Sequence, residues 1–112
     1  MFGNSGNQMV HMVQKHQWDK VEKKLSGADA EAKTALASAC GESSDEEASV
    51  LLLNLLQDSN EKVLLQAVKS LGAVGHDNAK TNLQWLSTSL PGDKKELQEA
   101  ISEAITKISR RE

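Results

Sequence analysis

The chain has 112 residues, of which 38% are hydrophobic, 26% charged and only 3% aromatic, with a single proline. This length accommodates one domain, and the composition is typical of a globular helical protein rather than a disordered chain. A formal net charge of −3 and a pI near 5.6 argue against a nucleic-acid partner, because nucleic-acid binders normally present a basic surface to phosphates.

The cysteine count and the length of the apolar runs indicate where in the cell the protein is expected. Cys40 is the sole cysteine, so the chain can form no internal disulfide and no cysteine-based zinc cage. The longest apolar run, Val50 to Leu53, is far shorter than the ~20 residues that cross a bilayer. The first residues lack the charged leader and long apolar stretch of a secretory signal. We therefore expect a cytoplasmic protein without a membrane partner.

Residues 1–13 form a predicted N-terminal extension or capping segment. The apolar residues from Met9 to Val13 lie on one side of a helical wheel, whereas those from Trp18 to Leu25 lie on another. One straight helix cannot bury both sets against one surface. We expect a short helix over about 8–13 to cap the rest of the chain, and the alternative is that this segment binds another molecule.

Apolar residues recur at helical spacing along the remaining residues, 14–112, which we predict to form a single domain. Asp29 and Asn60 are predicted helix N-caps, and the segments Ser44–Glu47 and Asp93–Glu96 have the spacing of a capping box. Glycines at the ends of the apolar stripes predict helix stops. The six predicted helices span roughly 14–25, 29–40, 45–57, 61–72, 78–90 and 94–109.

The predicted helices repeat in pairs. The segment from Asp29 to Gly41 aligns with the segment from Asn60 to Gly72 in its cap, its apolar stripe and its glycine stop. The repeats cover about 14–44, 45–75 and 76–109. A period of roughly 30 to 35 residues with paired helices is typical of an α-solenoid. We therefore predict an all-α fold, an α-α superhelix of about three helical hairpins.

The segment Leu55–Gly75, LLQDSNEKVLLQAVKSLGAVG, resembles the second-helix signature of HEAT repeats, especially the short bacterial and archaeal kind. It has an Asp/Asn turn, an acidic residue and a valine opening the helix, a central alanine and a Leu-Gly-x-x-Gly ending. The resemblance covers roughly Gln14 to Ser109, although the third repeat has Ile105-Thr106 in place of Leu-Gly.

This resemblance implies a non-catalytic scaffold or adaptor, with no cofactor, that binds another protein on a curved, armadillo-like helical surface. Two alternatives remain open. The chain could be related to HEAT-like bilin lyases or DNA glycosylases, or it could be an array that mainly self-associates through its repeat ends.

Gly72, Gly75 and Lys80 pose the question of a phosphate-binding loop. A Walker loop needs a preceding strand and a glycine directly before the lysine, but Ala79 precedes Lys80 and a helix precedes Gly72. We interpret the glycines as helix ends that make positive φ available. No Ser/His/Asp or Cys/His set stands out, so we predict no catalytic, metal or cofactor site and no enzyme.

The predicted partner-binding strip consists of Leu64, Leu65 and Lys69, flanked by Thr34 and Glu99. These residues belong to second helices, which the family resemblance places on the concave surface. The spacing of the apolar stripe directs Leu65 outward, beside Lys69. The alternative is that both leucines pack between neighbouring repeats.

Trp85 is a further candidate for partner binding. Its helical neighbours Thr81, Asn82, Thr88 and Ser89 are polar, and an exposed tryptophan would suit an interface anchor. The competing interpretation, which we favour, packs Trp85 beneath the C-terminal helix.

Overall fold

The computed structural model describes residues 4–111, which form seven α-helices and no strand. The chain is therefore all-α, as the periodicity predicted. The helices are α1 (Asn4–Gln14), α2 (Trp18–Leu25), α3 (Ala30–Cys40), α4 (Glu46–Leu55), α5 (Glu61–Val74), α6 (Asp77–Ser89) and α7 (Lys95–Arg111).

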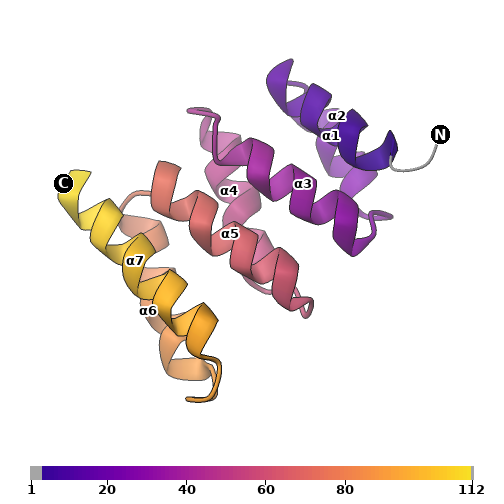
Figure 1. The fold of residues 1–112 in the computed structure, drawn as a ribbon. Coiled ribbons are helices and arrows are strands. Elements are labelled where there is room, and N and C mark those ends of the chain that lie inside the picture. The colour runs from indigo at the N-terminus through magenta and orange to yellow at the C-terminus, as the bar shows by residue number, and fades with distance from the viewer. Residues whose placement is uncertain (1–3, 112) are drawn as a thin grey trace.

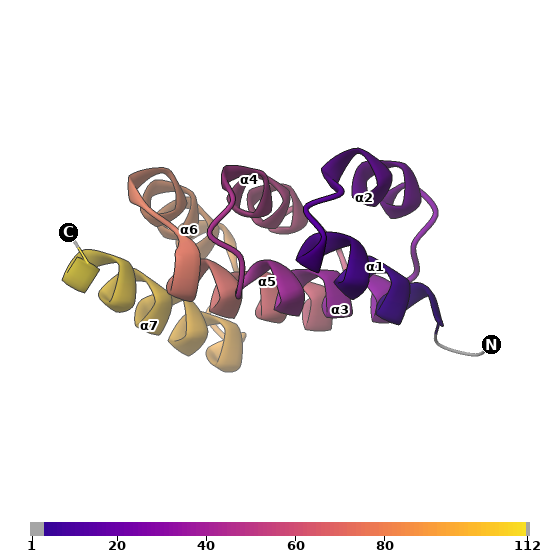
Figure 2. The same cartoon turned by 90° about the horizontal axis from the view of Figure 1, so that it is seen from above.

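The helices stack in two layers (Figures 1 and 2). One layer, here called the even layer, contains α2, α4 and α6; the other, the odd layer, contains α1, α3, α5 and α7. Helix α4 packs on α5, and α6 packs on α7, as two helical hairpins. The first pair differs, because α2 contacts mainly α1, and α1 packs on α3. The core lies between the layers, and its largest fully buried side chains are Met9, Leu36, Leu52, Leu71, Leu83, Ile101 and Ile108.

The chain turns sharply between α1 and α2. His16 has a left-handed φ of 59°. The Gln17 N–H donates to Met12 O at 2.8 Å and the His16 N–H donates to Val13 O at 3.0 Å, which are the two bonds of a Schellman helix end. The prediction of one continuous helix over 14–25 is therefore wrong, because this turn separates α1 from α2.

Helix α1 is longer than the expected helix at 8–13 and extends the odd layer beside α3 (Figure 2). Met9 and Val13 are buried on its inner face. A Cβ atom placed on Gly6 would lie 3.3 Å from the Cβ of Ala35, so the two helices lie close together. Trp18 and Val21 of α2 are buried as well, and Leu25 is half-buried. Two helices with different directions thus bury the two apolar sets that one helix could not.

Small residues bring successive helices of the odd layer close together. A Cβ atom on Gly41 would lie 2.8 Å from the Cβ of Ser70, and one on Gly72 would lie 3.0 Å from the Cα of Ala104. The Ser70 hydroxyl donates to Ala37 O at 2.7 Å. Gly41 and Gly72 hold the same position in successive repeats, so the same close approach recurs.

Gly72 and Gly75 do not use the positive φ that the sequence suggested. Gly72 lies inside α5, which continues to Val74, and Gly75 has a φ of −77°. A Cβ atom on Gly75 would lie 2.7 Å from the Cβ of Ala79 and 2.6 Å from Leu71 O. The expectation was wrong because close packing, not backbone handedness, requires these glycines.

Side-chain caps start two helices of the odd layer. The Asp29 carboxylate accepts a hydrogen bond from the Ala32 N–H at 2.9 Å, at the start of α3. The Asn60 side chain accepts from the N–H groups of Lys62 and Val63 at 3.0 and 3.2 Å, at the start of α5. Both predicted N-caps are confirmed.

The even-layer helices α4 and α6 begin without a side-chain cap, at Asp45 and His76. Asp45 Oδ2 lies 2.5 Å from His16 Nδ1 and accepts a hydrogen bond from Trp18 Nε1 at 2.9 Å. These two bonds lower the pKa of the Asp45 carboxyl. The capping box predicted at Ser44–Glu47 is wrong, because the helix starts one residue later and the carboxylate of its cap residue binds the α1–α2 turn.

Cys40 is fully buried at the end of α3. Burial raises the pKa of its thiol to about 12, so the side chain acts as a small apolar group. None of the helices in residues 4–111 combines the length and apolarity needed to cross a bilayer.

Candidate protein-binding surfaces

A groove on the surface of the odd layer runs between α5 and α7. Leu65 is half-buried in it, Lys69 is exposed one turn further along α5, and Glu99 reaches it from α7. These three residues line one hollow of about 170 Å³. The structure thus brings Glu99 of α7 together with Leu65 and Lys69 of α5, so three residues of the predicted strip meet.

Helix α7 contributes a row of carboxylates to this groove. Glu96, Glu99 and Glu103 are spaced three and four residues apart, so they share one helical face, and all three line the hollow. Lys107 Nζ lies 4.0 Å from Glu103 Oε1. The α7 wall is therefore mainly acidic and stands opposite Lys69. The sequence analysis missed Glu96 and Glu103, although their spacing could have shown them.

A second hollow, of about 460 Å³, continues the groove toward the α6–α7 loop and shares Leu65 and Glu96 with the first. Lys94 Nζ donates to Glu61 Oε2 at 2.6 Å and so links that loop to the start of α5. The Glu61 carboxylate raises the pKa of the Lys94 ammonium, chiefly through this hydrogen bond. One continuous groove follows α5 from its first turn to Lys69.

Leu64 and Thr34 lie outside this groove. Leu64 is only 7% exposed and belongs to the core, so its inclusion in an exposed strip is corrected. The alternative that both leucines pack between neighbouring repeats is therefore correct for Leu64. Leu65, one position further along the helix, is half-buried in the groove. Thr34 is half-buried on α3, and its hydroxyl donates to Ala30 O at 2.8 Å.

Trp85 is 71% exposed, so the interpretation that packs it beneath the C-terminal helix is wrong. Helix α6 turns Ala79 and Leu83 into the core, and a residue two positions after Leu83 points roughly 200° away from it. The hydroxyls of Thr88 and Ser89 donate to Trp85 O and stay within their own helix. Trp85 therefore stands out alone among polar side chains, away from the α5–α7 groove.

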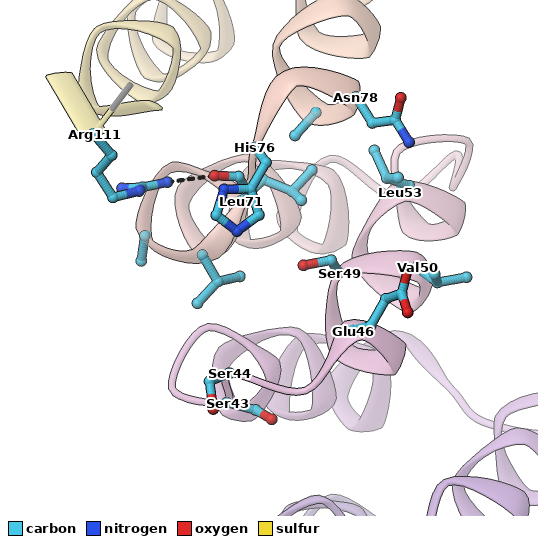
Figure 3. A pocket seen from close by; sticks show the side chains of 14 residues that line it. Ser43, Ser44, Glu46, Ser49, Val50, Leu53, Leu71, His76, Asn78 and Arg111 are labelled. Atoms are coloured by element: carbon cyan, nitrogen blue, oxygen red, sulfur yellow. Dashed lines mark hydrogen bonds between the residues drawn. The ribbon is translucent and has the colours of Figure 1, made fainter. Parts of the chain in front are cut away.

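A further hollow, of about 600 Å³, lies between α4 and α6 (Figure 3). Its apolar lining includes Val50 and Leu53 of α4 and Leu71 and Val74 of α5. The sequence analysis missed it. Four consecutive apolar residues, 50–53, could have shown it, because a helix that rotates 100° per residue cannot bury all four on one side. Val50 is the residue left 50% exposed.

The described part of the chain holds no group of three or more His, Cys, Asp or Glu residues that could bind a metal ion. Arg111, at the end of α7, donates hydrogen bonds to Gly72 O and Gly75 O, both at 2.7 Å. The candidate binding features of the described residues therefore include the α5–α7 groove, the hollow between α4 and α6, and the exposed Trp85.

Paired helices that repeat in two stacked layers define an α-solenoid, a class built from copies of one helical unit. The model of the HEAT-repeat family matches residues 19–106, and the chain belongs to this family. The resemblance found in the sequence is thus confirmed. HEAT repeats generally mediate protein–protein interaction and are typically non-enzymatic. Neither the curated proteins nor the solved structures contain a match to this chain.

Proposed function

We propose that this protein is a non-catalytic adaptor that binds another protein through the groove between α5 and α7. The observation that carries the proposal is the position of Leu65, half-buried between Lys69 of its own helix and the carboxylates of α7. An apolar centre with charged edges is the usual anatomy of a protein interface. A partner that places an apolar side chain on Leu65 and a basic side chain beside Glu99 would fit.

The charges of the groove also bear on the alternative functions. The two hollows of the groove are lined by five carboxylates and five lysines, so the groove lacks the basic surface that DNA phosphates require, which disfavours a function related to DNA glycosylases. On the side of α7 away from α5, Ser102 and Ser109 are exposed and Ile105 is half-buried, so little apolar surface is free there for end-to-end association. Both observations support an adaptor over these alternatives.

Affinity capture from a lysate of the source organism, read by mass spectrometry, tests the proposed groove. The wild type is compared with the variant Leu65→Ser/Lys69→Glu, which changes the apolar centre and one charged edge. Lys20→Glu, an exposed position on α2, is the matched control for the charge change. Circular dichroism confirms that each variant is folded.

We expect a protein that the wild type and the Lys20→Glu control retain and the groove variant loses. If all three chains retain the same proteins, the groove is not the binding surface.

A further inference from the structure

The hollow between α4 and α6 exists because the two layers pack differently. In the odd layer, Gly41 and Gly72 let α3, α5 and α7 approach closely. In the even layer, α4 and α6 meet at only a few residues. The space between them is closed at its base by the second half of α5. We call this space the α4–α6 cleft.

The floor of the α4–α6 cleft is apolar. Leu53 and Val74 line it above the fully buried Leu71, and the exposed Val50 forms part of its α4 wall (Figure 3). Its volume of about 600 Å³ falls within the roughly 300–1,000 Å³ of pockets that bind small ligands or side chains. An aliphatic side chain placed there would bury apolar surface that Val50 now exposes to water.

One rim of the cleft carries a fixed cation. The Arg111 guanidinium donates one hydrogen bond to Gly72 O and one to Gly75 O, so it is held beside His76 at the cleft edge (Figure 3). A guanidinium has five N–H groups, and these two bonds leave three for a ligand. Because the group is already oriented, little side-chain entropy is lost when an anion binds it.

The other polar groups around the cleft determine how a ligand with one charged end and one apolar end would be oriented in it. Helix α6 starts at His76 without a side-chain cap, so its first turn presents backbone N–H groups near Arg111. Glu46 lies on the opposite wall, on α4 (Figure 3). A carboxylate therefore fits the side of Arg111 and His76, and an aliphatic group fits the side of Val50 and Leu53.

We propose that the α4–α6 cleft binds the carboxyl terminus of a partner polypeptide whose last residue is aliphatic. The terminal carboxylate pairs with Arg111, and the last side chain lies on the floor between Val50 and Val74. The cleft is partly open to solvent, so the preceding residues of the partner can leave it. This site is separate from the α5–α7 groove, and it does not depend on that groove being used.

The test is an NMR titration of the ¹⁵N-labelled full chain with the acetylated peptide Ala-Ser-Val-Leu, which has a free carboxyl terminus. The same peptide with a carboxyl-terminal amide is the matched probe. We expect shifts of cleft amides such as those of Val50 and His76, and binding of the amide roughly tenfold weaker because it loses a charge-assisted hydrogen bond.

Three variants sharpen the test and leave the hydrogen bonds from Arg111 to the end of α5 in place. Val50→Glu should abolish binding of the acid, because it places a second carboxylate on the apolar wall. Glu46→Gln should strengthen binding by a few fold, since it removes a repulsive charge. Trp85→Ala, on α6 but outside the cleft lining, should leave binding unchanged.

Equal affinities of the acid and the amide, unchanged binding by the Val50→Glu variant, or no shifts up to about 10 mM peptide would overturn the proposal. Hexanoate that binds as tightly as the peptide would assign the cleft to a small free acid instead and would likewise overturn it. Arg111→Gln serves only as a supporting variant, because it also removes the two bonds to the end of α5.

Discussion

The odd layer and the even layer come from the same repeat, yet their helices start differently and pack at different distances from their neighbours. In the odd layer, α3 and α5 start with side-chain caps, and glycines hold successive helices close together. In the even layer, α4 and α6 start without such caps. Both large hydrophobic residues that are exposed in the described chain, Val50 and Trp85, lie on even-layer helices.

Because of this difference, the odd layer provides most of the close helix packing, and the even layer provides space for a ligand. The close helix contacts of the odd layer fix the stack, so the even layer does not need dense packing between its own helices. The space that remains there becomes the α4–α6 cleft. The α5–α7 groove lies on the well-packed layer and is lined by Leu65 and charged side chains rather than by an apolar floor.

The largest expected effect comes from breaking the core on the odd-layer side. Leu71→Asp buries an unpaired charge at a fully buried position of α5 and should cost about 4 kcal/mol or more. That cost is a large part of a typical folding stability of roughly 5–15 kcal/mol. Urea unfolding followed by circular dichroism measures it.

Val50→Asp makes a similar change at an exposed position of the even layer, and we expect it to stay within about 0.5 kcal/mol of the wild type. A cooperative transition that Leu71→Asp leaves unchanged would refute the helical register.

A smaller effect tests the close approach of α5 and α7. Gly72→Val should cost about 2 kcal/mol, because its Cβ would lie 3.0 Å from the backbone of Ala104, which cannot yield as a flexible side chain can. Ala73→Val adds a valine at the next position, which is exposed, and should cost well under 1 kcal/mol. Thermal melts of both variants compare the two costs, and equal shifts in Tm would show that the layer is not closely packed at Gly72.

The smallest expected effect concerns two carboxylates of the connecting segments. The Asp58 pKa is lowered from 3.8, first by the hydrogen bond from Lys33 and then by the Asn60 N–H; His16 and Trp18 lower the Asp45 pKa. A carboxyl group whose pKa is lower in the folded state stabilises the fold above pH 3.8, and this contribution is lost as the pH falls through the folded pKa.

Urea unfolding between about pH 5 and pH 2 should therefore show a falling free energy of unfolding, with a shallower fall in Asp58→Asn. The effect should be smaller than those of the packing variants, because these pairs are only partly buried and are still screened by solvent. An identical pH profile in the wild type and Asp58→Asn would contradict the role of this carboxylate.

Local signals in the sequence predicted features that depend on neighbours within one helical turn. The apolar period gave the helices, and the Asp29 and Asn60 caps act on backbone groups two or three residues away. The turn at His16 could not be predicted in this way, because it is joined to Asp45, which is 29 residues further along the chain. The same contact holds Asp45, which precedes α4 in the place where the sequence predicted Ser44 as the cap.

The candidate sites show the same division. Leu65 was predicted from its outward direction on its helix, Lys69 as its neighbour and Glu99 as a flanking residue of another second helix; these three residues do line one groove. The α4–α6 cleft was not predicted, because its lining comes from four helices and the α3–α4 loop. Spacing within one helix cannot reveal which faces of two other helices remain apart.

The sequence by itself determined that the chain is all-α, that its helices repeat in pairs and that it resembles HEAT repeats. These properties follow from local periodicity, from caps and from the repetition of both. Only the tertiary structure decided that Leu64 is buried beside a half-exposed Leu65, that Trp85 points into solvent and that Gly72 serves close packing. The physical reason is that burial depends on how near the next helix lies, and that distance is set by residues in other repeats.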